Sequence, residues 1–350
     1  MREKKYLNIA QILEDEILSG RWNVGDRLPT EPEFCARFGV ARQTLRQAVG
    51  MLEEQGLVER LQGSGTYVRA ATPAKQRRQT ICVMTTYLDD YIFPVILSGV
   101  EEVLTREGYN IQMRLTRNRI STERQNLLEL QNSECSGLII EGTKTALYNP
   151  NTAIYQNLAG TPTVFINGWS RDLHEISYVA ADDYQGARTL TEYLISRGHT
   201  AIGGIFKHDD IQGLKRHQGY LDALMEAGLP VEEESWRWYT TEDARFLFQP
   251  AMATWLRRFT AVMCYNDAMA VKVMRFAEAN DILVPEELSV TGFDNSELAE
   301  VMGLTTVAHP GAELGRVAAE AVLQLMKEPE VPVQRLLPMP LVERRSVSRR

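Results

Sequence analysis

Polar and aromatic side chains follow the ends of several apolar runs from Thr80 onward. The runs ICVMTT, SGLIIEG, TPTVFIN, TAIGGIF, TAVMCY and LSVTGF have the length and composition of buried strands. In open α/β sheets ligands bind at the carboxyl ends of the strands, so we expect the residues that follow these runs to share one cleft. They include Tyr87, Asp89, Asp90, Lys144, Trp169, Lys207, His208, Asp209, Asp210, Gln212, Arg216, Asn266, Asp267, Asp294, Asn295 and His309.

This mixture of groups suits a sugar, because carboxylates, amides and guanidinium groups pair with hydroxyls and an aromatic ring covers a C–H face. Each residue also has a purely structural interpretation. We expect Asp183, Asp267 and Asn295 to be helix N-caps. Asp89 and Asp90 are either solvated loop residues or part of a ligand loop. The structural alternative for Trp169 is a core residue, and for Arg216 it is a surface charge.

Apolar strands alternate with amphipathic helices from Thr80 to the end of the chain. Such alternation predicts parallel sheets covered by helices on both faces. The stretch is long for one sheet, so we predict two Rossmann-like lobes with a cleft between them. The fold class is therefore α/β for this part of the chain.

The stretch Leu28–Val68 predicts a different, smaller fold of helix, turn, helix and two-stranded hairpin. Thr30 with Glu33 forms a capping-box pattern, and Gly39 and Gly56 follow the two helices. Apolar positions in the second helix have helical spacing, while its first turn is basic and polar. A helix of this kind reads a DNA major groove, and a glycine-rich hairpin approaches phosphates. The alternative is a small helical subdomain with a solvated polar face.

The same stretch resembles the winged-helix domain of the GntR family, through LPTE, FGVARQTLRQA and GSGTYV. The resemblance covers about residues 4–70 and implies a winged helix-turn-helix that binds operator DNA. We take residues 1–70 as this domain and residues 71–79 as a linker. The residues expected to contact DNA are Lys5, Arg27, Arg42, Gln43, Thr44, Arg46, Gln62, Gly63, Ser64 and Gly65.

Residues 80–350 resemble the effector domain of the LacI/GalR repressors, which has the periplasmic-binding-protein type I fold. The motifs are LISRGHTAIG, RHQGY, AVMCYNDAMA, VPEELSVTGFDNSELA and LTTVAHP. The resemblance implies effector contacts from Arg216, Asn266 and Asp294, and less securely from His309. It also implies that this domain dimerises.

A GntR-type winged helix on a LacI/GalR-type domain is the architecture of repressors that respond to L-arabinose, which the motifs MTTYLDDYIFP, EGTKTAL and FKHDDIQGLKRHQGY also resemble. That resemblance adds Tyr87, Asp89, Asp90, Lys144 and Asp209 to the candidate effector contacts, beside Trp169. The hinge helix of the LacI/GalR repressors is missing, which puts their switching mechanism in doubt for this chain.

Composition sets further limits. Residues 1–78 hold 13 Lys and Arg against 10 Asp and Glu, and the remainder holds 25 against 36. A mildly basic module on an acidic body fits local DNA binding. No apolar run approaches the roughly 20 residues of a membrane helix, and the N-terminus shows no signal-peptide core. The four cysteines show no metal-ligand spacing. We expect a cytoplasmic, nucleoid-associated protein without a metal or cofactor.

These patterns together predict a sugar-responsive transcriptional repressor that binds operator DNA as a homodimer and is released by a small sugar, with L-arabinose implied by resemblance. Alternatives of the same architecture respond to another pentose, a hexose or a small polyol. A sugar-processing enzyme fused to a DNA-binding module is a rival from another class. The sequence contains neither G-x-x-x-x-G-K-[ST] nor G-x-S-x-G, which opposes an enzyme. A carboxylate pair among Asp89, Asp209 and Asp294 leaves a glycosidase as an open alternative.

Overall fold

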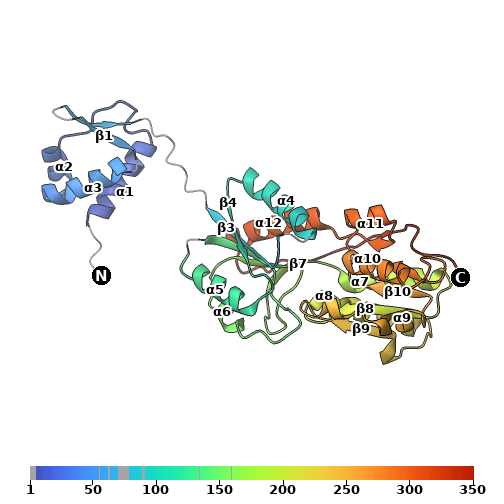
Figure 1. The fold of residues 1–350 in the computed structure, drawn as a ribbon. Coiled ribbons are helices and arrows are strands. Elements are labelled where there is room, and N and C mark those ends of the chain that lie inside the picture. The colour runs from blue at the N-terminus through green and yellow to red at the C-terminus, as the bar shows by residue number, and fades with distance from the viewer. Residues whose placement is uncertain are drawn as a thin grey trace. The chain divides into compact units, whose positions relative to one another are not determined.

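The computed structural model describes residues 5–54, 56–61, 64–69, 79–88, 91–133, 135–158 and 160–350 (Figure 1). The chain divides into two compact units, residues 1–78 and 79–350. Predicted contacts at Gln62, Gly63, Asp89 and Asp90, and most of the predicted linker, lie outside the described residues. Within the described ranges, no helix is long and apolar enough to cross a membrane.

The first unit is a winged helix. Its elements are α1 (Lys5–Leu18), α2 (Glu31–Phe38), α3 (Arg42–Glu54), β1 (Val58–Leu61) and β2 (Gly65–Val68), and the two strands form an antiparallel hairpin. Its core contains Leu13, Phe34, Leu45 and Leu52, each at most 1% exposed. Helix α3 contacts both α1 and α2 through this core, which leaves its polar face outside.

Local signals in the sequence explain where α2 begins and ends. The Glu33 carboxylate accepts hydrogen bonds from the backbone N–H and the hydroxyl of Thr30, both at 2.7 Å. Gly39 has a φ of 62°, a left-handed conformation that glycine adopts without the strain of a Cβ. The capping box and the glycine therefore set the angle at which α3 follows α2.

The second unit has two lobes, as predicted. The first lobe contains a six-stranded sheet with the order β13-β7-β6-β5-β3-β4, in which all neighbouring strands are parallel. Its elements are β3 (Thr80–Thr85), α4 (Ile92–Arg106), β4 (Asn110–Leu115), α5 (Ile120–Leu130), β5 (Cys135–Ile140), α6 (Thr152–Gln156), β6 (Thr163–Ile166), β7 (Ser177–Ala181), α12 (Gly311–Lys327) and β13 (Gln334–Leu337).

The second lobe contains a four-stranded parallel sheet with the order β11-β10-β8-β9. Its elements are α7 (Asp183–Ser196), β8 (Ile202–Lys207), α8 (Ile211–Glu226), the 3₁₀ turns η1 (Glu233–Ser235) and η2 (Ala244–Phe246), β9 (Trp236–Tyr239), α9 (Pro250–Leu256), β10 (Ala261–Cys264), α10 (Asp267–Glu278), β11 (Ser289–Thr291), α11 (Glu297–Met302), β12 (Thr306–Val307) and β14 (Leu341–Val342). Strands β12 and β14 pair antiparallel.

The chain passes between the lobes after β7, after β12 and after β13 (Figure 1). The second passage leads through His309 into α12, which packs on α4. The two helices approach so closely that a Cβ on Gly99 would lie 2.1 Å from the carbonyl oxygen of Ala312. A tight helix pair therefore anchors the segment that carries His309.

The three predicted helix caps are each wrong by one residue. The N-cap of α7 is Asp182, that of α10 is Asn266, and that of α11 is Ser296, and each side chain accepts a backbone hydrogen bond from its own helix. Asp183 and Asp267 are instead the first residues of their helices, and both are buried. Asn295 precedes its helix and accepts a hydrogen bond from Arg344 at 2.6 Å. These residues are therefore available for contacts that a capping side chain could not make.

Candidate effector pocket and nucleic-acid interface

The predicted DNA contacts on α3 lie at its N-terminal end. Arg42, Gln43 and Arg46 are exposed and Thr44 is half-buried, while Leu45 between them packs in the core. Arg46 forms an ion pair with Glu31 of α2, with its Nε 2.8 Å from the carboxylate. Both partners are exposed, so the pair costs little to break when a phosphate or base competes.

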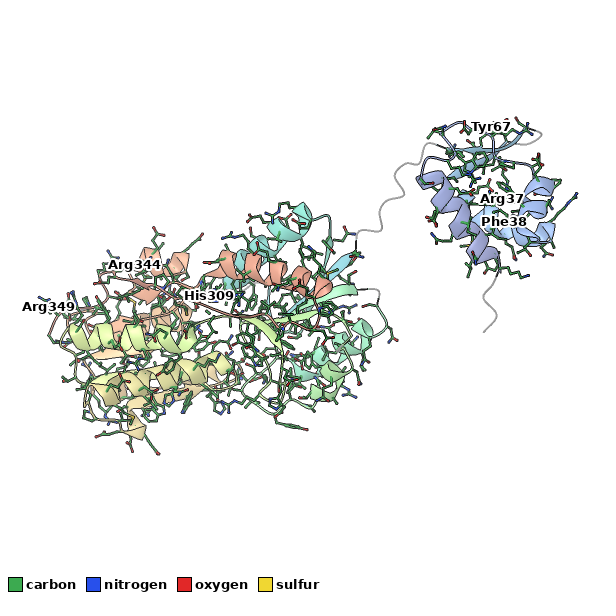
Figure 2. All side chains as sticks on the ribbon, turned by 180° about the vertical axis from the view of Figure 1, so that it is seen from behind. Arg37, Phe38, Tyr67, His309, Arg344 and Arg349 are labelled. Atoms are coloured by element: carbon green, nitrogen blue, oxygen red, sulfur yellow. The ribbon has the colours of Figure 1, made fainter. Side chains whose placement is uncertain are left out.

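The hairpin adds a second exposed surface (Figure 2). The hydroxyls of Ser64 and Tyr67 lie 2.8 Å apart. Gly65 has a φ of 133°, and a Cβ at this position would lie 2.7 Å from Nε of Arg27, so no other residue fits there without displacing that exposed arginine. Lys5 is exposed at the start of α1.

A cavity of about 280 Å³ in the second unit is lined by residues of both lobes. The first lobe contributes Tyr87, Tyr91, Ile92 and Asn167. The second lobe and the segment that passes between the lobes after β12 contribute Asp183, Lys207, Gln212, Arg216, Tyr239, Thr241, Ala244, Tyr265, Asn266, Asp294 and His309. Most of these side chains follow strand ends, as expected for ligand sites in open α/β folds.

Arg216 is the charged centre of the cavity. It comes from the second turn of α8, whose start lies so close to β8 that a Cβ on Gly213 would be 1.7 Å from the Lys207 carbonyl oxygen. Its Nε and NH2 groups lie 2.8 Å from the carboxylate of Asp183, and it donates to the Tyr265 carbonyl. The guanidinium also lies over the ring of Phe293 at 4.3 Å. These contacts hold the guanidinium in one orientation.

The electrostatics of this pair follow from burial. Burial alone would lower the pKa of Arg216, but the carboxylates of Asp183 and Asp294 outweigh it and raise the pKa. Burial raises the pKa of Asp183, and Arg216 opposes the rise. Each charge therefore depends on the other for compensation.

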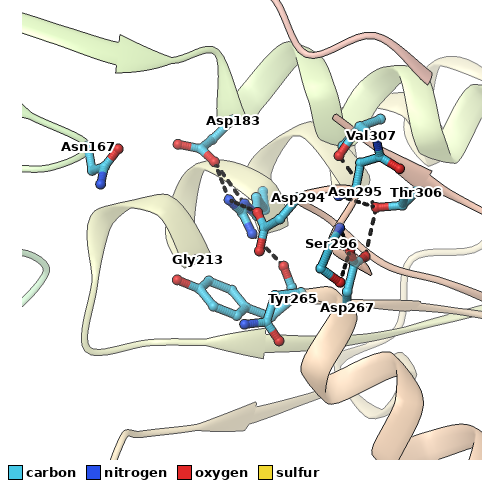
Figure 3. Close-up of polar contacts among 12 residues, drawn as sticks. Asn167, Asp183, Gly213, Tyr265, Asp267, Asp294, Asn295, Ser296, Thr306 and Val307 are labelled. Carbon is cyan, nitrogen blue, oxygen red and sulfur yellow. Dashed lines mark hydrogen bonds and ion pairs between the residues drawn. The ribbon is translucent and has the colours of Figure 1, made fainter. Parts of the chain in front are cut away.

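Asp294 lies on the loop after β11 (Figure 3), and its carboxylate faces Arg216. One carboxylate oxygen accepts a hydrogen bond from the Tyr91 hydroxyl of the other lobe. The other lies 3.6 Å from Arg216 NH2 and has no hydrogen-bond partner among the described residues. Asp294 has a φ of 102° and Asn295 a φ of 56°, so two successive non-glycine residues are left-handed. The surrounding structure must hold this loop in place, because such conformations carry strain.

Four buried polar atoms that belong to cavity-lining residues lack a hydrogen-bond partner within the described part of the chain: Asn167 Oδ1, Gln212 Oε1, Asp294 Oδ1 and His309 Nδ1. The Asn167 amide donates to the buried Glu141 carboxylate at 3.2 Å, which leaves its oxygen free as an acceptor. Burial lowers the pKa of His309 below its usual value, although the carboxylates of Asp294 and Asp183 oppose the shift. Buried acceptors without partners are costly, and ligand hydroxyls would satisfy them.

Lys207 is the second cation of the cavity. Its Nζ lies 2.9 Å from the Asp210 carboxylate and 3.6 Å from that of Asp209. Burial alone would lower the pKa of Lys207, but these two carboxylates raise it above its usual value. Lys207 and Arg216 therefore stand among four carboxylates, and the cavity has no surplus positive charge to attract an anion.

Tyr87, Arg216, Asn266, Asp294 and His309 are the predicted effector contacts that line the cavity. Asn266 both lines it and caps α10.

Lys144, Trp169 and Asp209 are predicted contacts that lie outside the cavity lining. Lys144 forms an ion pair with Glu242 of the second lobe. Trp169 stacks on Tyr178 with 4.4 Å between the ring centroids. The Asp209 carboxylate accepts hydrogen bonds from the backbone N–H and the hydroxyl of Thr241 at 3.1 and 2.7 Å.

Further contacts join the lobes beside the cavity. Asn118 of the first lobe donates to the Thr241 hydroxyl at 2.9 Å. The Thr145 hydroxyl accepts a hydrogen bond from the backbone N–H of Ile211, at the start of α8, at 2.9 Å. Together with the Lys144–Glu242 pair, these contacts hold the rims of the two lobes together.

The strand-end rule also found lining residues beyond the predicted effector contacts. Lys207 and Gln212 are among the residues expected to share the cleft, and Tyr265 ends one of the predicted strands. Asn167 also follows a strand, but nothing in the sequence indicated that Glu141 would orient its amide. Tyr239 and Thr241, at and after the end of β9, were missed because that strand was not predicted.

Comparisons with known proteins agree with this two-part architecture. Residues 5–68 match the bacterial regulatory proteins of the gntR family, and residues 191–347 match the periplasmic binding protein-like domain. The arabinose metabolism transcriptional repressor of Geobacillus stearothermophilus is 37% identical over 95% of this chain and 94% of its own length. The chain belongs to the family of arabinose metabolism transcriptional repressors.

A second member of this repressor family, from Halalkalibacterium halodurans, is 36% identical over 93% of this chain and 90% of its own length. Among solved structures, the transcription regulator CcpA of Lactococcus lactis is 25% identical, with a TM-score of 0.68 over 77% of this chain and all of its own. The predicted fold, a winged helix joined to a two-lobed effector domain, is thereby confirmed for this member of the family.

Proposed function

We propose that the chain is a transcriptional repressor whose winged helix binds operator DNA as part of a homodimer and is released when a small sugar, L-arabinose, fills the cavity between the lobes. Membership of the arabinose metabolism repressor family supports this assignment. The observation that carries the sugar part is the chemistry of the cavity. Buried acceptors without partners surround a fixed guanidinium, and all of them match hydroxyl groups.

The size and charge of the cavity favour a small neutral ligand. Its volume of about 280 Å³ lies near the lower end of the roughly 300–1,000 Å³ usual for ligand pockets. The carboxylates around Arg216 and Lys207 oppose a phosphorylated sugar or a sugar acid. Another pentose, a hexose or a small polyol carries the same hydroxyl groups. Measured binding affinities must therefore distinguish these ligands from L-arabinose.

The cavity carboxylates also bear on the rival enzyme function. Asp183 and Asp294 both face Arg216, and Asp183 is ion-paired at 2.8 Å. A glycosidase pair needs one carboxyl group that keeps its proton and one free carboxylate across the substrate. The arrangement here supports binding without turnover, so the ligand should be recovered unchanged.

Coupling between the two units follows from linkage. If the sugar weakens operator binding, the operator must weaken sugar binding by the same factor. A tenfold effect requires about 1.4 kcal/mol of coupling free energy. The DNA-bound dimer should recognise two related half-sites, because each subunit contributes one winged helix.

Calorimetric titration of the full-length protein with L-arabinose, D-xylose, D-galactose and L-arabinonate tests the effector assignment. Saturable binding of L-arabinose in preference to the other three supports it, and recovery of unchanged arabinose supports a binding function. Tighter binding of the anionic arabinonate would contradict the charge argument. Tighter binding of xylose or galactose would replace arabinose as the effector.

A further inference from the structure

Asp267 lies immediately behind the cavity without lining it. Its side chain is fully buried as the first residue of α10. It follows Asn266, which does line the cavity, and its carboxylate points away toward the loop that carries Asp294 (Figure 3). Burial and the neighbouring Asp294 carboxylate raise the pKa of Asp267. A buried carboxyl group at this place requires strong hydrogen-bond donors.

The hydrogen-bond partners of Asp267 lie on both sides of the two left-handed residues of the loop. The Asp267 carboxylate accepts from the backbone N–H and the hydroxyl of Ser296, at 2.7 and 3.0 Å. Its backbone N–H donates to the carbonyl of Phe293 at 2.9 Å. One residue therefore fixes the chain just before and just after Asp294 and Asn295, whose positive φ values are strained.

The same carboxylate reaches the neighbouring strand. The Thr306 hydroxyl donates to it at 2.7 Å, and the next residue, Val307, accepts the backbone N–H of Asp294 at 2.8 Å. Gly292 is equally constrained, since a Cβ there would lie 2.4 Å from an Asp267 oxygen. The loop is thus packed against Asp267 at Gly292 and is held to the neighbouring strand through Thr306 and Val307.

We propose that Asp267 is a positioning residue that holds Asp294 in its left-handed conformation and so sets sugar affinity without contacting the sugar. The proposal rests on the cavity being the sugar site. Without the hydrogen bonds that the Asp267 carboxylate accepts from Ser296 and Thr306, the loop relaxes. The Asp294 carboxylate then leaves the position from which it faces Arg216. Asp294 is then lost as a hydroxyl acceptor even though it is still present in the sequence.

A double-mutant cycle on the full-length protein tests whether Asp267 acts through Asp294. Sugar affinity is measured by calorimetry with L-arabinose for Asp267→Ala, Asp294→Asn and the double variant. We expect the alanine variant to bind at least tenfold more weakly than the wild type, and the double variant to bind within about twofold of Asp294→Asn. Losses that multiply in the double variant would overturn the proposal, as would unchanged affinity in folded Asp267→Ala.

Asp267→Asn provides a milder variant if the alanine substitution prevents folding. Its one carbonyl oxygen can serve Ser296 or Thr306 but not both, so we expect an intermediate loss of affinity. Ser289→Ala is the matched control, since it removes a buried hydrogen bond from the same lobe, to the backbone of Ser348, away from the loop. It should lower the melting temperature and leave sugar affinity unchanged.

A crystal structure of an Asp267 variant gives a readout that is independent of affinity. We expect residue 294 to leave the left-handed region or its carboxylate to move away from Arg216. An unchanged Asp294 in that structure would overturn the proposal. If the wild-type protein binds no arabinose, the proposed effector fails, while the position of Asp294 in the variant still decides the role of Asp267.

Discussion

Replacing Arg216 with methionine tests whether the cavity depends on a compensated buried charge. The substitution keeps most of the aliphatic length and removes the guanidinium from between Asp183 and Asp294. Asp183 is 2% exposed, so removing Arg216 leaves its carboxylate largely buried and without a compensating charge. The variant should therefore be destabilised and should also lose its sugar response.

The expected size follows from the burial of the pair. Breaking a buried ion pair by removing one partner costs about 3–5 kcal/mol. In a unit of this size each kcal/mol lowers the melting temperature by roughly 2–4 °C, so the expected drop is about 6–20 °C. The double variant Arg216→Met with Asp183→Asn should recover much of this loss, because the orphaned carboxylate is gone. It should not recover sugar binding.

The pH dependence of the loss has a definite sign. Burial already raises the pKa of Asp183 above its unfolded value, and removing Arg216 raises it further. A raised folded-state pKa favours the folded protein at low pH, and that advantage disappears as pH rises through the folded-state value. The methionine variant should therefore be less destabilised at pH 5 than at pH 8.

Thermal melting followed by circular dichroism, with and without L-arabinose, measures both effects. Arg316→Met is the control, because Arg316 and Glu102 form an exposed ion pair at 3.4 Å. It should change stability by less than about 1 kcal/mol. If Arg216→Met melts within a degree or two of the wild type, or still gains stability from arabinose, the role of Arg216 is refuted.

Three further predictions concern other parts of the molecule. Arg46→Ala should weaken operator binding about 5- to 150-fold, as expected for the loss of about 1–3 kcal/mol from one base contact. Its arabinose affinity, measured by calorimetry, should be unchanged. Unchanged operator affinity would remove Arg46 from the interface. Lys144→Glu and Glu242→Lys should each weaken arabinose binding by up to about fivefold, and the exchanged pair should restore it; no restoration would mean that Lys144 contacts the sugar directly. Burial lowers the pKa of His217 to about 4. Between about pH 6.5 and 4, acid should therefore destabilise the wild type more than His217→Phe. The expected difference in the free energy of unfolding, measured by denaturant titration, is up to about 3 kcal/mol. Equal acid sensitivity of the two proteins would contradict this.

Periodicity and turn residues were sufficient to predict most of the fold. The alternation of apolar strands and amphipathic helices predicted two parallel-sheet lobes, and the capping box at Thr30 with Gly39 predicted the turn before α3. Short elements were missed because they carry little periodic signal. Strand β9 has only four residues, WRWY, which is too short a stretch for its strand-favouring aromatic side chains to identify it.

The strand-end rule brought Arg216, Asn266 and Asp294 to one cavity, but it could not say how they are held there. The positive φ of Asp294 depends on contacts with residues on α10 and β12, which are distant in the sequence. Cap positions were also one residue off, since Asp, Asn and Ser are all acceptable caps and neighbouring candidates compete. The fold decides that competition through tertiary contacts, which bury Asp183 and Asp267 and pair Asn295 with Arg344.

Sugar in the cavity is expected to release the winged helix from DNA. Fluorescence anisotropy of the full-length protein on DNA from upstream of its own gene, at fixed salt, tests it directly. We expect tight binding that L-arabinose releases and that Arg46→Ala weakens. Tight binding that is unchanged by saturating arabinose, in a protein shown by calorimetry to bind that sugar, would contradict it.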